Sequence, residues 1–310
     1  MKLVSVGSVA FDAIETPFGK SDKIVGGAGS YIALTASYFT KPAGLVSVVG
    51  GDFDQSFLKD LESRSVDLAG LQTKADEKSF FWSGKYHNDM NSRDTLVTEL
   101  NVLGEFDPIL PEAYQAPDFL MLGNLSPEVQ MKVINQISNR PKLVVLDTMN
   151  FWMDIAWDDL MAVLPKIDVL TINDEEARQL SKEYSLVKAA QKIMSMGPKF
   201  LIIKKGEHGA LLFNKNNEVF FAPALPLEEV FDPTGAGDTF AGGFIGYLAS
   251  TSDISFENMK RAIIVGSAMA SFCVEKFGTE RLQNLTQDEI DDRVESFVSL
   301  TQFDMTLTAE

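Results

Sequence analysis

The chain alternates between short apolar runs and longer amphipathic stretches. Runs rich in β-branched residues predict buried strands at 2–6, 44–49, 118–122, 143–146, 168–172 and 199–203. Between most of these runs, apolar residues recur at helical spacing over 28–39, 54–64, 127–138, 174–181 and 185–195. Further helices are predicted after the last strand, over 238–250, 255–275 and 287–300. This alternation predicts an α/β fold with a doubly wound, mainly parallel sheet and helices on both faces.

Two segments break this alternation. Residues 79–86 and 95–102 both alternate apolar and polar positions, and the polar stretch between them predicts a hairpin. The side chains that share a face are Phe80, Trp82 and Tyr86 in the first run, and Leu96, Thr98, Leu100 and Val102 in the second. Residues 11–24 are expected to add one or two short strands. We expect one domain over residues 1–310, with segments at about 11–24 and 78–103 inserted as a small β-sheet lid. Alternatively, the aromatic side chains form a packing face or a dimer contact.

Composition limits the classes of function. The 310 residues are 45% apolar, enough for a large core, and their formal net charge of −17 argues against a nucleic-acid-binding surface. The single cysteine, Cys273, excludes an internal disulfide framework and fits a reducing compartment. The first residues read as a strand rather than a signal peptide, and no apolar run is long enough to span a bilayer. The sequence therefore predicts a cytoplasmic protein that has no membrane partner.

The most informative segment runs from Val230 to Phe240 and contains a Gly-Ala-Gly turn followed by Asp238. A helix is expected to begin here, because Phe240, Phe244 and Leu248 recur at helical spacing. The free N–H groups of such a turn and helix N-terminus can hold a phosphate. A carboxylate beside that phosphate repels it, unless its role is to receive a proton from a hydroxyl attacking the phosphorus. The segment therefore predicts phosphoryl transfer to an alcohol.

Residues 232–238, Asp-Pro-Thr-Gly-Ala-Gly-Asp, resemble the C-terminal signature of the ribokinase-like (PfkB) carbohydrate and nucleoside kinases. The resemblance implies that Asp238 is the base and that a monovalent cation, K⁺ in particular, binds near Asp232. It also implies backbone roles for Gly235, Ala236 and Gly237 as an anion hole, and nucleotide contact by Thr234. On the motif alone, Asp238 can also be an ordinary carboxylate favoured by the helix dipole. The same dipole is expected to keep Asp238 ionised and weakly basic.

A second resemblance lies near the N-terminus, where residues 25–31 are similar to the G-G-x-x-x-N signature that lines the sugar site of the same family. It implies substrate contacts by Gly26 and Gly27. Tyr31 stands where the family usually has Asn, and its phenol favours a ligand with a flat or apolar part.

Two further side chains are expected to contact the acceptor. Asp12 follows the first strand, where the family places a carboxylate that accepts hydrogen bonds from substrate hydroxyls. Trp82 of the predicted hairpin is expected to join these substrate contacts. The alternatives are an ordinary loop-to-helix turn for the glycines and a simple turn residue for Asp12.

Two weaker motifs are expected to serve the nucleotide. Asn173 and Glu176 match the N-x-x-E motif, which in the family helps to position Mg²⁺ and the phosphates, often through water. An N-cap with a capping box explains the same pair without any ligand. The family also has a Gly-x-x-Gly turn beside the nucleotide, which Gly206 and Gly209 match, and Lys205 is within reach of a phosphate.

Other phosphate and hydrolase motifs do not match. A P-loop would need glycine where Ile14 stands, and a dinucleotide fingerprint would need it at Phe240. With His87 and His208 as the two histidines, a histidine metal cluster is not expected, and no nucleophile elbow is present. Residues 147–150 resemble the D-x-N of some sugar kinases only loosely, with one residue too many.

The sequence thus predicts an ATP- and Mg²⁺-dependent kinase that phosphorylates a hydroxyl of a small sugar-like substrate. A nucleoside kinase of the same fold is the alternative supported by Tyr31 and the aromatic hairpin. A non-catalytic sugar- or nucleoside-binding regulator is the alternative from another class, and the intact Asp238 argues against it. A homodimer formed through the lid is the expected protein partner, and no nucleic-acid partner is expected.

Overall fold

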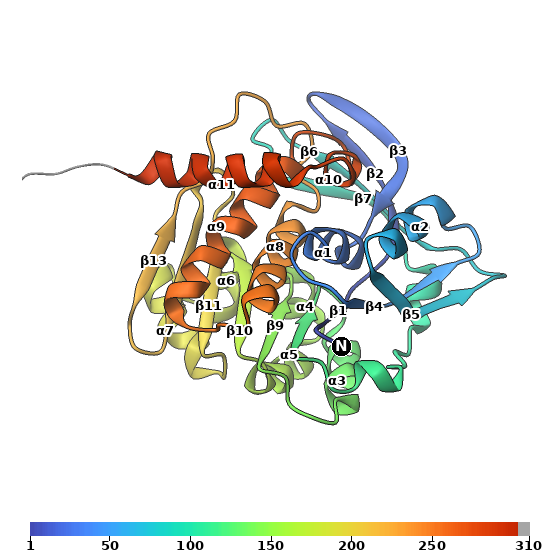
Figure 1. The fold of residues 1–310 in the computed structure, drawn as a ribbon, viewed down its shortest axis with the longest axis horizontal. Helices are drawn as coiled ribbons and strands as arrows, with labels where there is room; N and C mark the ends of the chain where they lie inside the picture. Colours follow the sequence, from blue (N-terminus) through green and yellow to red (C-terminus); the bar gives the residue numbers. More distant parts are fainter. Residues whose placement is uncertain (303–310) are drawn as a thin grey trace, which may run out of the picture.

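The computed structural model describes residues 1–302, and a large mixed sheet forms its centre (Figure 1). The strand order across this sheet is β13-β12-β11-β10-β9-β8-β1-β4-β5. The strands are β1 (Leu3–Val6), β4 (Ala43–Gly50), β5 (Val66–Lys74), β8 (Phe119–Leu122), β9 (Leu143–Asp147), β10 (Val169–Asn173), β11 (Phe200–Lys204), β12 (Ala210–Asn214) and β13 (Val219–Ala222). All neighbours pair in parallel except β12 and β13, which extend the β11 edge in antiparallel pairing. The predicted fold class is confirmed.

Helices cover both faces of this sheet (Figure 1). One layer contains α1 (Ala28–Ala36), α2 (Gln55–Ser63), α8 (Ala236–Thr251), α9 (Phe256–Cys273), α10 (Glu280–Gln283) and α11 (Gln287–Thr301). The other contains α3 (Pro127–Gln136), α4 (Asn150–Ile155), α5 (Trp157–Val163), α6 (Asp174–Ser181) and α7 (Leu186–Ser195). In β1, Leu3 packs toward α8 and α9, whereas Val4 and Val6 pack toward the second layer. Burial on both faces is why these strands read as unbroken apolar runs.

The order of the strands marks where a ligand can bind. From β1 the chain adds β4 and β5 on one side and then crosses back to place β8 on the other. Such a reversal separates the loops that follow two neighbouring parallel strands and leaves a crevice at their carboxyl ends. The residues after β1 and β8 therefore lie at the edge where open α/β sheets bind small molecules.

A second, four-stranded sheet lies at the upper right of Figure 1, in the order β3-β2-β6-β7. Its strands are β2 (Ala10–Thr16), β3 (Gly19–Gly26), β6 (Phe80–Tyr86) and β7 (Arg93–Glu99). The expected hairpin and the expected strands within 11–24 are confirmed. The expectation that Leu100 and Val102 continue the second strand is wrong, because the chain turns into a 3-10 helix over Asn101–Glu105. Val102 is buried in the main core instead of sharing a strand face with Leu96.

Several elements were not predicted, among them β5, β13, α4 and α5. The two strands lie at the edges of the main sheet; β5 mixes exposed and buried positions without regular alternation, and β13 has only four residues. The two helices are short, six and seven residues, so few apolar positions repeat within them. Weak periodicity accounts for all four omissions.

Close packing of α1 on α8 depends on Gly242. A Cβ at this position would lie 2.8 Å from the carbonyl oxygen of Ile32 and 2.9 Å from Cβ of Thr35. Gly242→Ala should lower the free energy of unfolding by about 1–3 kcal/mol, although alanine is the better helix former, because α1 backbone must move. Urea denaturation measures the change. Gly104→Ala is the control, since its Cβ would meet no atom closer than 3.5 Å. Equal stability of both variants would contradict the prediction.

Candidate functional site

The segment 232–238 forms a fixed turn at the start of α8. Asp232 is fully buried, and its carboxylate accepts the N–H groups of Thr234 at 2.9 Å and Gly278 at 3.1 Å. Gly235 has a φ of 76°, a left-handed conformation that glycine adopts without strain, and it directly precedes the first helical residue. The amides that follow are therefore presented at the N-terminus of a 16-residue helix, where anions bind.

Asp238 lies in the first turn of α8 and is partly buried. Burial and the charge of Asp147 raise its pKa to about 7, while Lys204 and Arg93 oppose the shift. The expectation that Asp238 stays ionised and weakly basic is wrong, because loss of hydration and a neighbouring carboxylate raise its pKa. A carboxylate with this pKa is able to accept a proton near neutral pH.

Asp12 projects from β2 of the small sheet and is buried against Gly26. A Cβ on Gly26 would lie 1.9 Å from Oδ2 of Asp12, so only glycine leaves room for this carboxylate. Burial and the charges of Asp232 and Asp238 raise the pKa of Asp12 to about 8, with the Gly27 amide acting against them. Asp12 in the small sheet and Asp238 in α8 therefore lie close enough for their charges to interact.

Tyr31, the expected substrate contact, is buried against the 232–238 turn. Its side chain is 1% exposed, and its ring lies where a side chain on Gly235 would be, with Cζ 2.3 Å from that Cβ position. The hydroxyl is buried and has no hydrogen-bond partner among residues 1–302. The phenol that replaces the family asparagine thus packs beneath the glycine turn and helps to fix its conformation.

Asn173 and Glu176 form the capping box at the start of α6. Asn173 Oδ1 accepts the Glu176 N–H at 2.8 Å, and Glu176 Oε2 accepts the Asn173 N–H at 2.7 Å. The N-cap with a capping box, which was the alternative explanation of this motif, is therefore present. Burial is the main cause that raises the pKa of Glu176 to about 7, and Lys204 counteracts it. Burial makes the charged form of the Glu176 carboxyl group unfavourable, and a helix cap alone does not require such burial. A perturbed pKa of this kind is typical of a residue that also has a functional role.

The cation that most lowers the pKa of Asp238 and of Glu176 is Lys204, which was not predicted from the sequence. Its Nζ lies 2.9 Å from Oδ2 of Asp147, at the ends of β11 and β9. The neighbouring Lys205, expected to reach a phosphate, instead lies over the Phe221 ring with Nζ 6.0 Å from the centroid. Lys204 is the last residue of β11, whereas Lys205 begins the turn that follows the strand. The loosely matching residues 147–150 were the one signal that pointed to Asp147.

One face of the small sheet carries Trp82, Tyr86 and Arg93. Trp82 is the register partner of Asp12, and Arg93 is the partner of Tyr86. The Arg93 guanidinium lies 5.6 Å from the Trp82 ring centroid and 5.9 Å from that of Tyr86. Thr234 donates its hydroxyl hydrogen to the Tyr86 oxygen at 3.2 Å, so this face contacts the 232–238 turn. The sequence did not indicate a role for Arg93, because this residue lies in the polar stretch that was predicted to be the loop of the hairpin; in the structure it begins β7.

The small sheet also contacts two other loops. Gly206 and Gly209 have φ values of 54° and 80°, as a tight turn requires. A Cβ on Gly206 would lie 2.7 Å from Oδ1 of Asn91, at the end of the β6–β7 hairpin. In the turn between β2 and β3 of the small sheet, Phe18 packs on Phe231 with ring centroids 6.1 Å apart.

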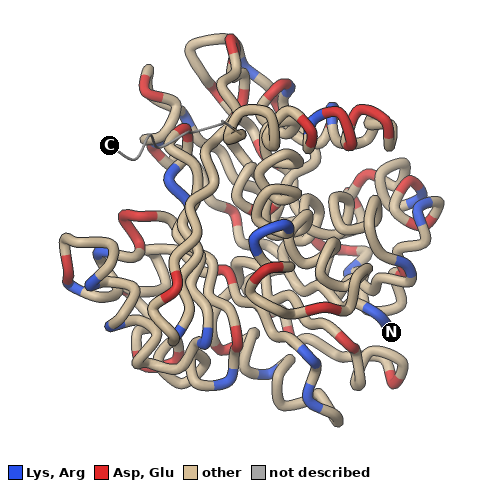
Figure 2. The backbone as a smooth tube through the Cα atoms, turned by 60° about the vertical axis from the view of Figure 1, so that its left-hand side comes forward, with Lys and Arg blue, Asp and Glu red and all other residues tan. Residues whose placement is uncertain are grey.

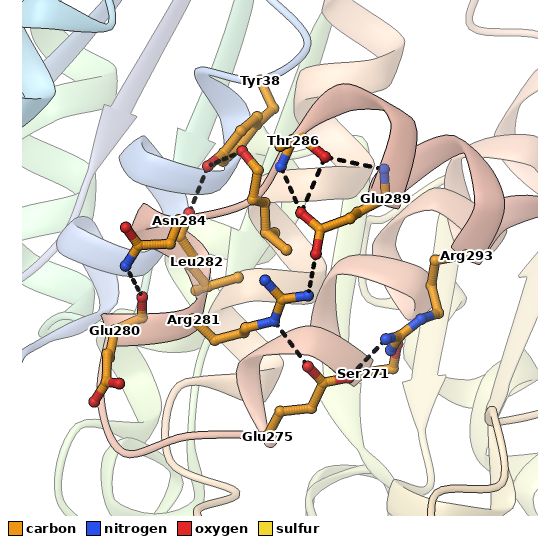
Figure 3. Close-up of polar contacts among 11 residues, drawn as sticks. Tyr38, Ser271, Glu275, Glu280, Arg281, Leu282, Asn284, Thr286, Glu289 and Arg293 are labelled. Atoms are coloured by element: carbon orange, nitrogen blue, oxygen red, sulfur yellow. Dashed lines mark hydrogen bonds and ion pairs between the residues drawn. The ribbon is translucent and has the colours of Figure 1, made fainter.

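An ion-pair network supports the turn behind Asp232 (Figure 3). Glu275 pairs with Arg281 at 2.9 Å and with Arg293 at 2.6 Å, and Arg281 also pairs with Glu289 at 2.7 Å. The adjacent Val274 carbonyl accepts the Phe231 N–H at 2.8 Å. The network therefore ties α10 and α11 to the segment that positions the 232–238 turn.

Charge elsewhere is dispersed. Figure 2 shows basic positions spread singly among acidic ones over many elements. Within residues 1–302, no set of three or more His, Cys, Asp or Glu side chains is arranged to hold a metal ion. None of the helices in that part of the chain has the length and apolar character needed to cross a membrane.

The raised pKa values predict how stability depends on pH. Asp12, Asp238 and Glu176 ionise near 8, 7 and 7 in the folded chain, against 3.8 to 4.5 ordinarily. Folding therefore retains protons that the unfolded chain has lost, and the free energy of unfolding should fall from pH 6 to pH 8.5, by on the order of 3 kcal/mol. Thermal melts across this range test it. Asp12→Asn should flatten the curve, and a slope equal to wild type would contradict this assignment.

Comparisons with known proteins agree with this geometry. The cytidine kinase of Thermococcus kodakarensis is 31% identical over 249 residues, covering 79% of this chain and 87% of that protein. The nucleoside kinase structure of Methanocaldococcus jannaschii has a TM-score of 0.75 at 21% identity, covering 95% and 98% of the two chains. A putative ribokinase II of E. coli, in complex with ATP and Mg²⁺, has a TM-score of 0.77 at 19% identity, covering 96% and 99%. Residues 1–285 match the family described as pfkB family carbohydrate kinase, so the chain belongs to this family of phosphotransferases and has its ribokinase fold.

Proposed function

We propose that this kinase transfers the γ-phosphoryl group of ATP to a hydroxyl of a nucleoside, with Asp238 as the base. The observation that carries the proposal is the position of Asp238 in the first turn of α8, directly after the left-handed Gly235. A carboxyl group with a pKa of about 7 lies there beside an anion-binding helix N-terminus. This pairing suits proton transfer from an attacking hydroxyl.

The acceptor is held from the small sheet. Asp12 accepts hydrogen bonds from substrate hydroxyls, and the Gly26–Gly27 backbone allows close approach because Gly27 has a φ of 89°. Asp12 belongs to the face that also carries Trp82, so a hydroxylated ring and a flat base can be bound side by side. That combination, with the relatedness to a cytidine kinase, supports a nucleoside over a simple sugar.

The phosphoryl group is held from the main sheet. The amides of Gly235, Ala236 and Gly237 serve as the anion hole, while Thr234 and the Gly206–Gly209 turn border the nucleotide. The charge on the phosphates requires a cation, and bound Mg²⁺ would neutralise it and orient the γ-phosphoryl group.

The described chain fits such an ion. Mg²⁺ is usually held by phosphates, water and one or two carboxylates, and Glu176 with its partner Asn173 is the group placed to act through water.

Two finer roles remain predictions. The Asp232 carboxylate accepts amide N–H groups at both oxygens, and monovalent-cation binding near it is inferred from the family resemblance alone. A homodimer through the small sheet is supported by β7, an edge strand whose seven residues are all exposed. Its apolar side chains Leu96 and Val97 are 55% and 41% exposed.

Removing the base tests the mechanism. Asp238→Asn should lower kcat by about 10²–10⁴-fold with little change in ATP affinity, because the amide cannot accept the proton. Steady-state rates and calorimetric ATP titration measure the two quantities. In wild type, kcat should fall as the pH falls through about 7, as Asp238 becomes protonated. A variant with near-normal turnover would remove Asp238 from the chemistry.

A panel of acceptors tests the substrate class. With Mg²⁺ and ATP, ADP formation should be stimulated by cytidine or another nucleoside at least tenfold more than by ribose, because only the nucleoside also occupies the Trp82 face. Trp82→Ala should raise the KM for the nucleoside roughly tenfold through lost stacking and leave the weaker activity on ribose unchanged. Preference for the free sugar would overturn the nucleoside assignment while leaving the kinase assignment intact.

A further inference from the structure

Lys204 places a positive charge among the buried carboxylates of the site. Its side chain is 19% exposed, and the Asp147 side chain that it contacts at 2.9 Å is 7% exposed. Asp147 also accepts the Thr148 N–H at 2.9 Å through its other oxygen. The carboxylate is thereby fixed at both oxygens, and it holds the ammonium group in one position.

The ammonium group lies directly against the anion hole. A Cβ built on Gly237 would be 3.0 Å from Nζ of Lys204, so the group lies beside the Cα of that glycine. Gly237 precedes Asp238, and Lys204 lowers the pKa of both Asp238 and Glu176. The lysine therefore lies between the proposed base, the proposed metal-supporting carboxylate and the phosphate-binding amides.

A purely structural role explains this pair poorly. Asp147 ends β9 and Lys204 ends β11, and β10 lies between these two strands. The pair spans an already hydrogen-bonded sheet that does not need it for register. Buried ion pairs are weak stabilisers, because desolvation offsets their attraction.

We propose that Lys204 is a catalytic residue that contacts the phosphoryl group during transfer, and that Asp147 is the positioning residue that directs its ammonium group. The inference rests on the proposed phosphotransfer. The bond from phosphorus to the β–γ bridging oxygen breaks, a bond to the acceptor oxygen forms, and the acceptor proton passes to Asp238. Lys204 stays protonated throughout and balances charge on the equatorial oxygens.

Lys204→Met tests the contact. Its kcat should fall about 10²–10³-fold, and the preference for ATP over ADP in calorimetric binding with Mg²⁺ should fall at least tenfold. Lys204→Arg should recover part of both. The ATP-to-ADP ratio needs no acceptor, so it reports on Lys204 even if the acceptor is not a nucleoside. Asp147→Asn should lower kcat by about tenfold and reduce the same ratio, since the lysine remains but is no longer held.

Lys199→Met is the matched control. It removes a lysine that pairs with the buried Asp168 at 2.9 Å, at the opposite end of β11. Its kcat and ATP-to-ADP ratio should equal those of wild type. If Lys204→Met fails to fold because Asp147 is left unpaired, the double variant Lys204→Met/Asp147→Asn removes both charges and is measured instead.

The possible results separate the two proposals. Wild-type turnover together with an unchanged ATP-to-ADP ratio in Lys204→Met, or in the double variant, would overturn the role of Lys204 and leave the kinase intact. Absence of phosphotransfer by wild type would overturn the proposed function. Loss of melting temperature alone, with kcat and the ratio preserved, would mark the pair as structural and also overturn the inference.

Discussion

The site depends on keeping several carboxyl groups close together and away from water. Burial raises the pKa of Asp12, Asp232 and Asp238, and the charges of the latter two raise that of Asp12 further. Such groups persist in a fold only with compensating donors or charges. Backbone amides supply them to Asp232, and Lys204 and Arg93 supply them to Asp238. A phosphate arriving alone would add to the negative charge, which is a physical reason for substrates that enter together with a divalent cation.

The same constraint explains how the 232–238 turn is held. A carboxylate and a phosphate-binding turn can share a small volume only if neither moves, since a shift of an ångström changes both charge balance and reaction geometry. Tyr31 fills the space beside Gly235, and the turn at 274–278 forms hydrogen bonds with the Asp232 segment. The ion pairs of Figure 3 anchor that second support to the C-terminal helices. Packing and electrostatics together thus fix the backbone conformation of the turn.

The sequence was sufficient for features that local pattern determines. Strands buried on both faces, the 174–181 helix and the glycine turn before Asp238 all follow from spacing within a few residues. Lys204 was not recognisable, because nothing local shows that one lysine of an adjacent pair points inward beside Asp147, 57 residues away. The packing of Tyr31 was not predictable for the same reason: its environment is set by Gly235, which is distant in sequence but adjacent in space. Register and packing across the sheet determine these positions, and neither leaves a periodic signal.

The two sheets divide the chemistry between them. Asp238, Lys204 and the amide turn belong to the main domain, whereas Asp12, Trp82 and Arg93 belong to the small sheet. In the proposed mechanism, a hydroxyl bound to Asp12 would meet Asp238 only when the small sheet lies over the turn, and the Tyr86–Thr234 hydrogen bond and the Asn91–Gly206 contact define that arrangement. Lifting the small sheet would also withdraw the Arg93 charge that offsets the carboxylates. In the proposed mechanism, closure of the small sheet would therefore complete the acceptor site and the charge balance in one step, which would tie phosphoryl transfer to the presence of an acceptor and disfavour transfer to water.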